Sequence, residues 1–235
     1  NWFLIALVSP LLWSITNHID KHLISKYIQG SAVGALIIFS SLIGLFLLPF
    51  ILVIQPNVLN INIFNAFLIT INGAIYVLAL LPYFYALEKD ETSIVVPLFQ
   101  LIPVFGYFLA LIFLGESLTL QQIFASLLVI LGAIIISIEP KKLKFKFQVF
   151  WLMILSSFLV ALNGLIFKFV AIQQDFWITS FWEYVGFVLI LIIFILFFKS
   201  YRNQFLLMFR KNPFSTLGLN GLNEIFNIIA KMIMN

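Results

Sequence analysis

A polar stripe in the last apolar stretch of the chain is the pattern with the clearest chemical meaning. Its members, spaced i, i+3, i+4, i+7 and i+11, are Asn220, Asn223, Glu224, Asn227 and Lys231. Side chains at this spacing share one face of a helix. A polar face inside a membrane must contact protein or a water-filled cavity, because lipid tails offer polar groups no partners. If the chain lies in a membrane, the stripe therefore predicts a pathway or a binding site for a solute.

The composition places the chain in a membrane. Of its 235 residues, 63% are hydrophobic and only 9% are charged, and the mean hydropathy is +1.14, which no ordinary soluble domain reaches. Backbone groups in lipid must be paired within their own segment, so we expect an all-α protein whose main partner is the lipid bilayer. The net charge of +4 comes from basic residues beside apolar spans. Basic residues in this position are better explained by the orientation of the chain in the membrane than by binding to nucleic acid.

The residue types also exclude several kinds of site. The chain has no cysteine, which rules out disulfides, thiolate metal sites and cysteine nucleophiles. The two histidines, His18 and His22, lack the carboxylates that would complete a metal site, so we expect neither a metal nor another cofactor. We find no phosphate-binding glycine loop and no nucleophile elbow. The sequence therefore does not predict an enzyme.

Apolar stretches of about 20 residues predict a polytopic protein with about eight transmembrane helices. They cover residues 2–24, 32–54, 65–87, 93–114, 119–138, 149–171, 178–198 and 214–235. Most connections are short, so neighbouring helices should be antiparallel. The two longer connections, Glu139 to Gln148 and Lys199 to Pro213, are basic and are expected to be loops. The first of them is the expected domain boundary.

The basic residues predict the orientation. Eleven of the thirteen lysines and arginines are expected on one side of the membrane, and they are Lys21, Lys26, Lys89, Lys141, Lys142, Lys144, Lys146, Lys199, Arg202, Arg210 and Lys211. The positive-inside rule places this side in the cytoplasm and the first residue outside. We expect a multi-pass protein of a prokaryotic plasma membrane.

The chain carries weak internal repetition. A shift of 147 residues places Ser9 on Ser156, and a shift of 148 places Asn72-Gly73 on Asn220-Gly221. The nearly constant offset predicts two copies of a five-helix unit. Because five is an odd number, the second copy must be inverted relative to the first.

Several segments of the first copy resemble the EamA domain of the drug/metabolite transporter superfamily. They are Tyr83–Glu88, Val95–Leu98 and Ile102–Val104, then Phe113–Glu116 and Leu131–Ile134. The resemblance implies that residues 2–138 form one complete five-helix repeat and residues 149–235 the first three helices of a second. We therefore expect a fragment that lacks the last two helices of the second repeat. The resemblance implies a secondary carrier of small organic solutes that works by alternating access, with export as the preferred direction.

A central cavity between the two repeats is the expected solute site. Its candidate lining residues are Asn17, Asn72, Tyr76, Tyr83, Gln100, Asn163, Asn220, Asn223, Glu224 and Asn227. The two tyrosines offer stacking or cation–π surface. Pro97 and Pro103 should break the fourth helix and expose backbone near Gln100 and Gly106.

Other polar residues leave alternatives open. Asn17, Asp20 and Lys21 form either a hydrogen-bonded cluster or, as the simpler interpretation, an interfacial group. Glu183 either pairs with Lys168 or lies at the interface. Glu116 should cap the fifth helix.

Two other functions remain open from the sequence alone. One is an integral membrane enzyme that acts on lipid intermediates, with Glu224, His18 and Glu183 as acid–base groups. The other is a membrane scaffold that transports nothing, in which the polar stripe only packs helices together.

Overall fold

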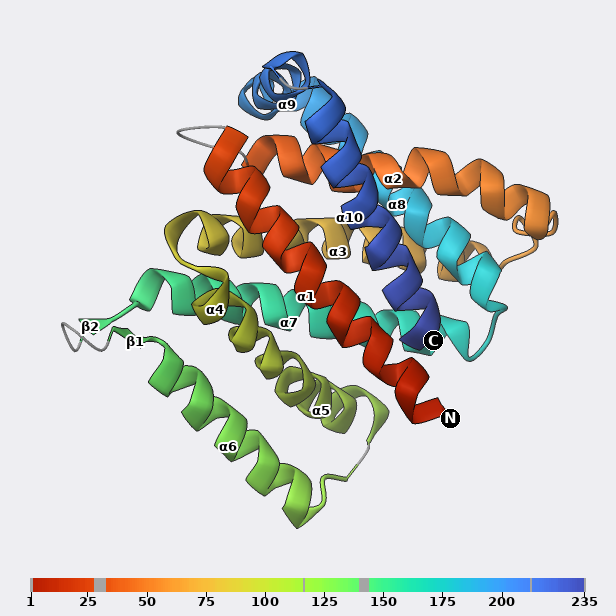
Figure 1. Cartoon of the computed structure of the whole chain (residues 1–235). Coiled ribbons are helices and arrows are strands. Elements are labelled where there is room, and N and C mark those ends of the chain that lie inside the picture. The colour runs from red at the N-terminus through yellow and green to blue at the C-terminus, as the bar shows by residue number, and fades with distance from the viewer. Residues whose placement is uncertain (1, 28–32, 116, 140–143, 212, 235) are drawn as a thin grey trace.

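The computed structural model describes residues 2–27, 33–115, 117–139, 144–211 and 213–234, and helices dominate it (Figure 1). The helices are α1 (Trp2–Tyr27), α2 (Val33–Ile54), α3 (Ile63–Lys89), α4 (Thr92–Val95), the 3₁₀ helix η1 (Val96–Gln100), α5 (Leu101–Leu114), α6 (Leu120–Ile136), α7 (Phe147–Ala171), α8 (Phe176–Phe197), α9 (Lys199–Lys211) and α10 (Pro213–Met234). Two short strands, β1 (Ile138–Glu139) and β2 (Lys144–Phe145), pair antiparallel between α6 and α7.

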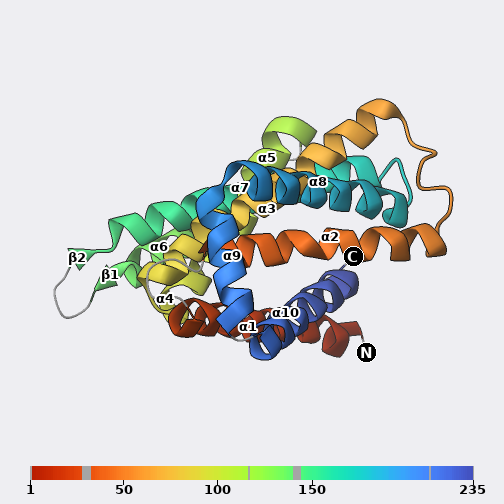
Figure 2. The same ribbon diagram turned by 90° about the horizontal axis from the view of Figure 1, so that it is seen from above.

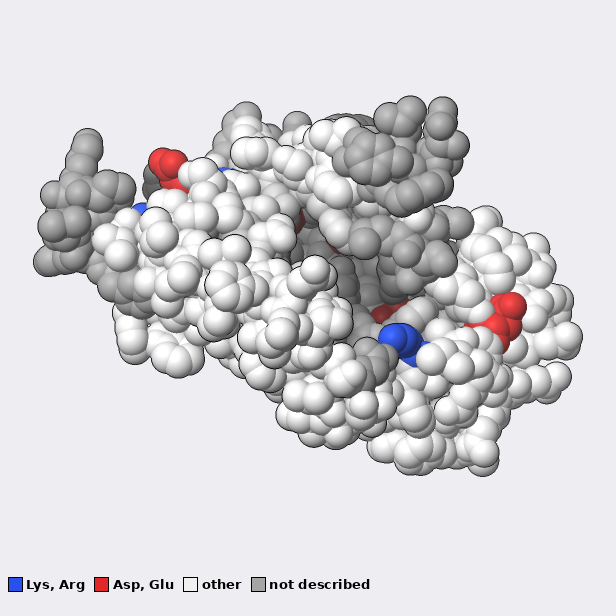
Figure 3. Space-filling model, turned by 90° about the horizontal axis from the view of Figure 1, so that it is seen from below, with Lys and Arg blue, Asp and Glu red and all other residues white. Residues whose placement is uncertain are grey.

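The lengths and composition of the helices confirm the prediction of an all-α polytopic membrane protein. Among the described residues, five helices are long and apolar enough to cross a membrane: α2, α3, the run Thr92–Leu114, α7 and α8. Helix α6 is apolar but shorter. Helices α1 and α10 have 26 and 22 residues, which exceeds the roughly 20 residues that a bilayer requires. The surface is accordingly almost free of charge over most of the face in Figure 3.

The fourth predicted helix is interrupted at Pro97, as expected. The expected break at Pro103 is wrong, because Pro103 lies in the first turn of α5, where a helix tolerates proline. The interrupted helix consists of α4, the 3₁₀ segment that contains Pro97, and α5, which begins at Leu101. Proline lacks the amide hydrogen of an α-helix and crowds the preceding turn, so the chain tightens there. Helix α5 ends at Gly115 in the left-handed region, with φ 65°. A capping box between Thr119 and Gln122 starts α6, while Glu116, the expected cap, lies outside the described residues.

The expectation of a loop between Lys199 and Pro213 is wrong, because this segment forms α9. Its inner face contains Tyr201, Phe205 and Met208, which pack against the core. This helix lies against α2 and touches the ends of α8 and α10. Its sequence is too short and too basic to span lipid, but Tyr201, Phe205 and Met208 are spaced i, i+4 and i+7 and form one apolar face, which α2 covers.

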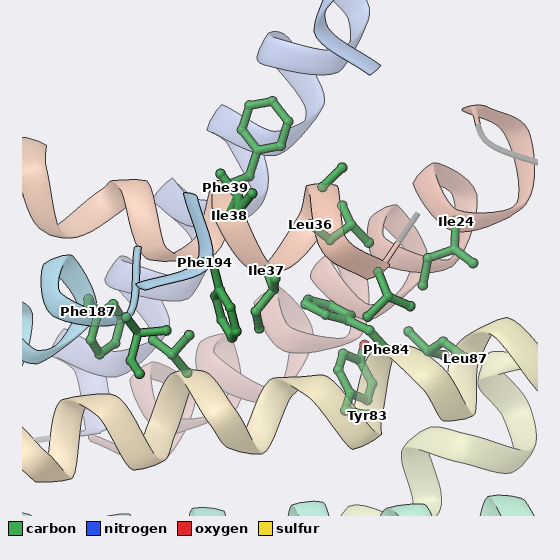
Figure 4. Packing of buried hydrophobic residues seen from close by; sticks show 14 of the residues in the cluster. Ile24, Leu36, Ile37, Ile38, Phe39, Tyr83, Phe84, Leu87, Phe187 and Phe194 are labelled. Atoms are coloured by element: carbon green, nitrogen blue, oxygen red, sulfur yellow. The ribbon is translucent and has the colours of Figure 1, made fainter. Parts of the chain in front are cut away.

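The long helices pack in a regular pattern. Helix α3 lies along α7 and α8, α2 lies along α8, and α1 lies along α10. Figure 2 shows α1 and α10 together on one side of α2, with α3, α7 and α8 on the other side. The apolar core forms where α1, α2, α3 and α8 meet, around side chains such as Ile24, Ile37, Phe84 and Phe194 (Figure 4).

Two serine hydrogen bonds repeat in this packing. Ser9 of α1 donates to the Ala230 carbonyl of α10 over 3.0 Å, and Ser156 of α7 donates to the Ala79 carbonyl of α3 over 2.8 Å. The two serines are the pair that the 147-residue shift superimposes. The 148-residue shift carries Ala79 to within one helical turn of Ala230.

The crossing of α3 and α8 is unusually close, because two glycines face backbone there. A Cβ atom added to Gly73 would collide with the backbone of Glu183, and one added to Gly186 would collide with the Thr70 carbonyl. Thr70 also donates its hydroxyl to the Trp182 carbonyl over 3.3 Å. Helix α10, in contrast, touches α2 only slightly, and no described atom of another element lies within 4 Å of a Cβ added to Gly221.

The ends of the helices that carry the basic residues lie together. Lys21 donates to the carbonyls of Leu87 and Asp90 over 2.6 and 2.8 Å, and Lys146 forms an ion pair with Asp90 at 2.6 Å. The hydroxyls of Tyr85 and Tyr201 share a hydrogen bond of 2.8 Å, which brings α9 to the end of α3. These contacts place the C-terminal ends of α1 and α3 and the N-terminal ends of α7 and α9 on one side, whose cytoplasmic location stays a prediction.

Candidate functional site

The polar stripe of α10 faces the protein. Asn220 and Asn223 are 5% and 3% exposed, and Glu224 and Asn227 are half-buried. The opposite side of α10 is apolar and exposed, with Leu222, Ile225 and Ile229 on its surface. The side chain of Lys231 lies outside the described residues. Helix α10 therefore turns its polar face inward and its apolar face outward, as a helix at the lipid boundary of a bundle should.

A hydrogen-bonded cluster, which we call the Asp20 cluster, joins Asn17 and Asp20 of α1 to Tyr83 of α3 and Asn223 of α10. The Asn223 amide donates to Asp20 Oδ1 over 2.6 Å. The Tyr83 hydroxyl lies 3.1 Å from Asp20 Oδ2 and 2.7 Å from Asn17 Oδ1, so its single hydrogen serves two acceptors. Polar groups from three helices therefore converge on one carboxyl.

Of the two alternatives for Asp20, the structure shows the hydrogen-bonded cluster. This residue is only 6% exposed, because α10 packs along α1 and covers it. Lys21 follows it in sequence but points about 100° further round the helix. It reaches the end of α3 instead and caps carbonyls there.

Glu224 adds a second carboxyl to this region. It follows Asn223 on α10, is hydrogen-bonded to the Ser40 hydroxyl of α2, and lies close enough to Asp20 for the two charges to interact. The Asn223 side chain has an unused acceptor, because its Oδ1 is buried with no hydrogen-bond partner among the described residues. Two carboxyls and a free amide oxygen thus share one buried region.

Glu183 forms a separate polar cluster with Asn163 and Asn72. Its carboxyl is fully buried and accepts a hydrogen bond from Asn163 Nδ2 over 3.1 Å. The same nitrogen lies 3.2 Å from the Asn72 carbonyl, and the Asn72 side-chain amide has no hydrogen-bond partner within the described part of the chain. Glu183 therefore lies inside the bundle and not at the interface, whereas Lys168 is exposed on α7.

Tyrosines lie between these clusters. Tyr184 of α8 is close enough to both Glu183 and Glu224 to interact with their charges. Tyr76 stacks on Phe187 with ring centroids 5.5 Å apart and planes within 9°, and it interacts with Tyr83. The buried polar groups therefore extend through the bundle from α1 to α8.

An apolar cavity of about 50 Å³ lies next to Tyr184, between α2, α8 and α10. Its lining residues are Leu47, Phe50, Ile51, Phe176, Trp177, Ser180, Tyr184 and Ile228. Among them, Ser180 has a buried hydroxyl without a hydrogen-bond partner among the described residues. In Figure 3 the molecule is hollowed on the face seen from below, and acidic side chains are visible in the hollow.

The structure brings together some of the predicted lining residues and not others. Asn17, Tyr83 and Asn223 meet at Asp20, whereas Gln100 is exposed, and a Cβ added to Gly106 meets no described atom of another element within 4 Å. Their roles in solute binding stay predictions.

The predicted lining set missed five residues of this region, namely Asp20, Ser40, Ser180, Glu183 and Tyr184. Two of them had a usable sequence signal: Asp20 has i+3 spacing from Asn17, which puts both on one face, and Glu183 is a carboxyl within an apolar span. No group of three or more His, Cys, Asp or Glu side chains in the described ranges could hold a metal ion.

Comparison with known proteins agrees with the resemblance inferred from the sequence. The sequence model of the EamA-like transporter family matches residues 1–138. An uncharacterized protein of Methanocaldococcus jannaschii is 34% identical over 120 residues, which is 51% of this chain and 80% of that protein.

Proposed function

We propose, since the chain belongs to the EamA-like transporter family, that the whole protein carries small organic solutes by alternating access between two inverted halves. The family consists of membrane transporters of small solutes. Export as the direction, and the plasma membrane of a prokaryote as the location, are part of this proposal. Export follows from family resemblance alone, because the residues themselves do not encode a direction.

The observation that carries the proposal is the set of carboxyls inside an otherwise apolar bundle. Asp20, Glu183 and Glu224 lie on three different membrane helices, and all face protein. A charged side chain within a bilayer costs several kcal/mol on insertion scales, about 2.5–3.5 for Asp at the centre of a helix. Such residues are retained mostly where they line a pathway for a solute or an ion.

The packing supports two inverted halves. If α1 corresponds to α7 and α3 to α10, the pair α1–α10 is the equivalent of the pair α7–α3. Both pairs pack along their length, and both contain the serine-to-carbonyl bond made by Ser9 or Ser156. Equivalent bonds in the two pairs are what an inverted repeat produces.

The packing also supports an opening on one side. By the same correspondence, the contact of α3 with α8 is the equivalent of the contact of α10 with α2. The first is closed through Gly73 and Gly186, and the second is slight. An unequal pair of equivalent contacts is the expected form of a carrier whose site faces one side of the membrane.

Solute flux in sealed vesicles tests the proposal. The whole protein is reconstituted in liposomes, and movement of solutes from a metabolite mixture is followed by mass spectrometry. We expect transport that Glu224→Gln reduces and that Glu88→Gln, the same change at an exposed position near the end of α3, leaves unchanged. Chemical conversion of a lipid or solute without net movement would support the enzyme instead, and equal flux in vesicles with and without protein would refute a carrier.

A further inference from the structure

We propose that an anionic phospholipid binds in a groove between the end of α3 and the start of α7. Its phosphate group binds at Lys89 and Gln148, and one of its acyl chains lies along Trp151, Leu152 and Leu155. This site is separate from the polar clusters inside the bundle, so the inference does not rest on solute transport.

The groove has a polar end and a long apolar floor. Its volume is about 470 Å³, and it lies on the first turns of α7, the helix that starts beside β2 in Figure 1. Its lining residues are Lys89, Phe147, Gln148, Trp151, Leu152 and Leu155. From Phe147 to Leu155 the helix rises about 12 Å, which is close to the depth of one leaflet of a hydrocarbon core about 30 Å thick. The groove is therefore long enough to hold most of one acyl chain.

The polar end of the groove offers a cation to the phosphate. Lys89 is exposed in the last turn of α3, and no ion pair joins it to another described residue. Both carboxylate oxygens of its neighbour Asp90 are engaged, because Oδ2 pairs with Lys146 at 2.6 Å and Oδ1 accepts the Glu91 amide over 2.8 Å. The other acidic residue of this turn, Glu88, is exposed and does not line the groove. Lys89 is thus the one charged side chain in the described lining, and its charge complements a phosphate.

Gln148 adds a hydrogen-bond donor at the same end. It is exposed in the first turn of α7, and its side-chain amide can donate to a phosphate or ester oxygen. An amide beside an ammonium group suits a lipid headgroup, which has several acceptor oxygens within a short distance of one another.

Aromatic rings form the wall next to the polar end. Trp151 is 50% exposed, and its ring is roughly perpendicular to those of Phe147 and Phe150, with centroids 5.7 and 6.1 Å apart. These contacts hold the indole in place, so little side-chain ordering is needed when a lipid binds. Tryptophan also favours the membrane interface, where headgroups give way to acyl chains. Trp151 is therefore placed where a phospholipid changes from polar to apolar.

The combination of these groups distinguishes the groove from the rest of the lipid-facing surface. Many apolar side chains of the outer helices are exposed, and any acyl chain can cover them. A basic side chain, an amide and a tryptophan at one end of an apolar groove match the order of groups in a single phospholipid. A second copy of the chain placed here would bury the Lys89 ammonium and would need an acid of its own to pair with it, whereas an anionic phospholipid brings its phosphate.

Native mass spectrometry of the purified whole protein tests the inference. The protein is titrated in detergent with two probes, dioleoyl phosphatidylglycerol and dioleoyl phosphatidylcholine, in separate experiments, and the affinity for the first bound lipid is measured. We expect about a fivefold preference for phosphatidylglycerol, the size of the attraction of one lysine to an anionic membrane surface. Equal affinity for the two lipids, or binding of neither, would overturn the inference.

Two pairs of variants assign the binding to this groove. Lys89→Gln should reduce the preference to about one, whereas Lys199→Gln, the same change at an exposed residue on the same side of the membrane, should keep it. Leu155→Trp fills the apolar floor and should weaken both lipids by a similar factor, whereas Ile112→Trp, at an exposed position of α5, should weaken neither. All four positions are exposed, so the variants should fold, and thermal unfolding checks this. If both lysine variants lower the preference equally, the attraction belongs to the whole surface and the assigned groove is wrong.

Other occupants of the groove would give different results. Inorganic phosphate, added up to millimolar concentration, should not displace phosphatidylglycerol; if it does, the groove is a site for a free anion. If Leu155→Trp changes the proportion of dimers and leaves lipid affinity unchanged, the groove is an interface between copies of the chain. Either result would reject the lipid, and neither depends on whether the protein transports a solute.

Discussion

Replacing Gly73 by alanine should destabilise the crossing of α3 and α8. The added Cβ would collide with the backbone of Glu183, and backbone within a packed helix cannot rotate away as a side chain can. The two helices must then separate or tilt. Gly186→Ala should have a similar effect, because its Cβ would meet the Thr70 carbonyl.

The size of the effect follows from comparison with Gly221→Ala. An alanine in a helix is intrinsically more favourable than a glycine by about 1 kcal/mol in water, and this gain applies to both variants. The collision applies only to Gly73, because no described atom of another element lies within 4 Å of a Cβ at Gly221. Inserting a methyl group into a close-packed contact costs about 1–3 kcal/mol. The difference between the two variants should therefore be about 1–3 kcal/mol, or roughly 2–12 °C in Tm for a chain of this size.

Thermal unfolding of the whole protein in a mild detergent measures this difference. Tryptophan fluorescence is a suitable signal, because Trp177 and Trp182 lie on α8. We expect Gly73→Ala to unfold at the lower temperature and Gly221→Ala at or above the temperature of the unchanged protein. If Gly73→Ala is as stable as Gly221→Ala, the two helices are not in close contact at this crossing and the expected collision does not exist.

Two further predictions concern tyrosines at the polar contacts. Tyr83→Phe removes the donor that Asn17 and Asp20 share, so it should lower stability by about 0.6–1.7 kcal/mol, the range measured for hydrogen bonds between membrane helices; an unchanged Tm would show that the hydroxyl contributes nothing. Burial, followed by the hydrogen bond to Tyr85, raises the pKa of Tyr201 on the interfacial helix α9. Its contribution to stability should therefore be complete below about pH 10, where a free tyrosine begins to ionise, and should be lost as the pH rises through the raised pKa. Thermal melts between pH 7 and 11 should show this loss, and Tyr201→Phe should make it smaller; a variant with the same pH profile would contradict the assignment.

The spanning helices were predictable because their cause is local. A run of about 20 apolar residues must form a helix in lipid whatever its neighbours are, and Pro97 interrupts such a helix through its own missing amide hydrogen. Helix α9 is stabilised instead by packing against other helices. Its side chain Met208 is buried, and Tyr201 and Phe205 are partly buried, where α9 packs against α2 and the end of α3. The i, i+4 and i+7 spacing of these three residues is the sequence signal of an amphipathic helix, but it does not say which element covers the apolar face.

In the candidate site, too, some features follow from the local sequence and others depend on which helices pack together. The stripe on α10 was predictable because lipid tails cannot satisfy five polar residues that share one face of an apolar helix, so that face must turn toward protein or water. The burial of Asp20 was predictable only as one of two alternatives, because Asp20 and Lys21 are adjacent polar residues near the end of a span. One is buried and the other caps α3. Which of them turns inward depends on where α10 packs, and that contact joins residues about 200 positions apart.

The slight contact between α10 and α2 has a consequence for the carboxyls. Glu224 is held by Ser40 at this contact, so α10 cannot move against α2 without changing the surroundings of that carboxyl. If the two halves are inverted copies, closing α10 onto α2 would give Gly221 the role that Gly73 has at the closed crossing. The absence of any described neighbour around Gly221 leaves room for this movement.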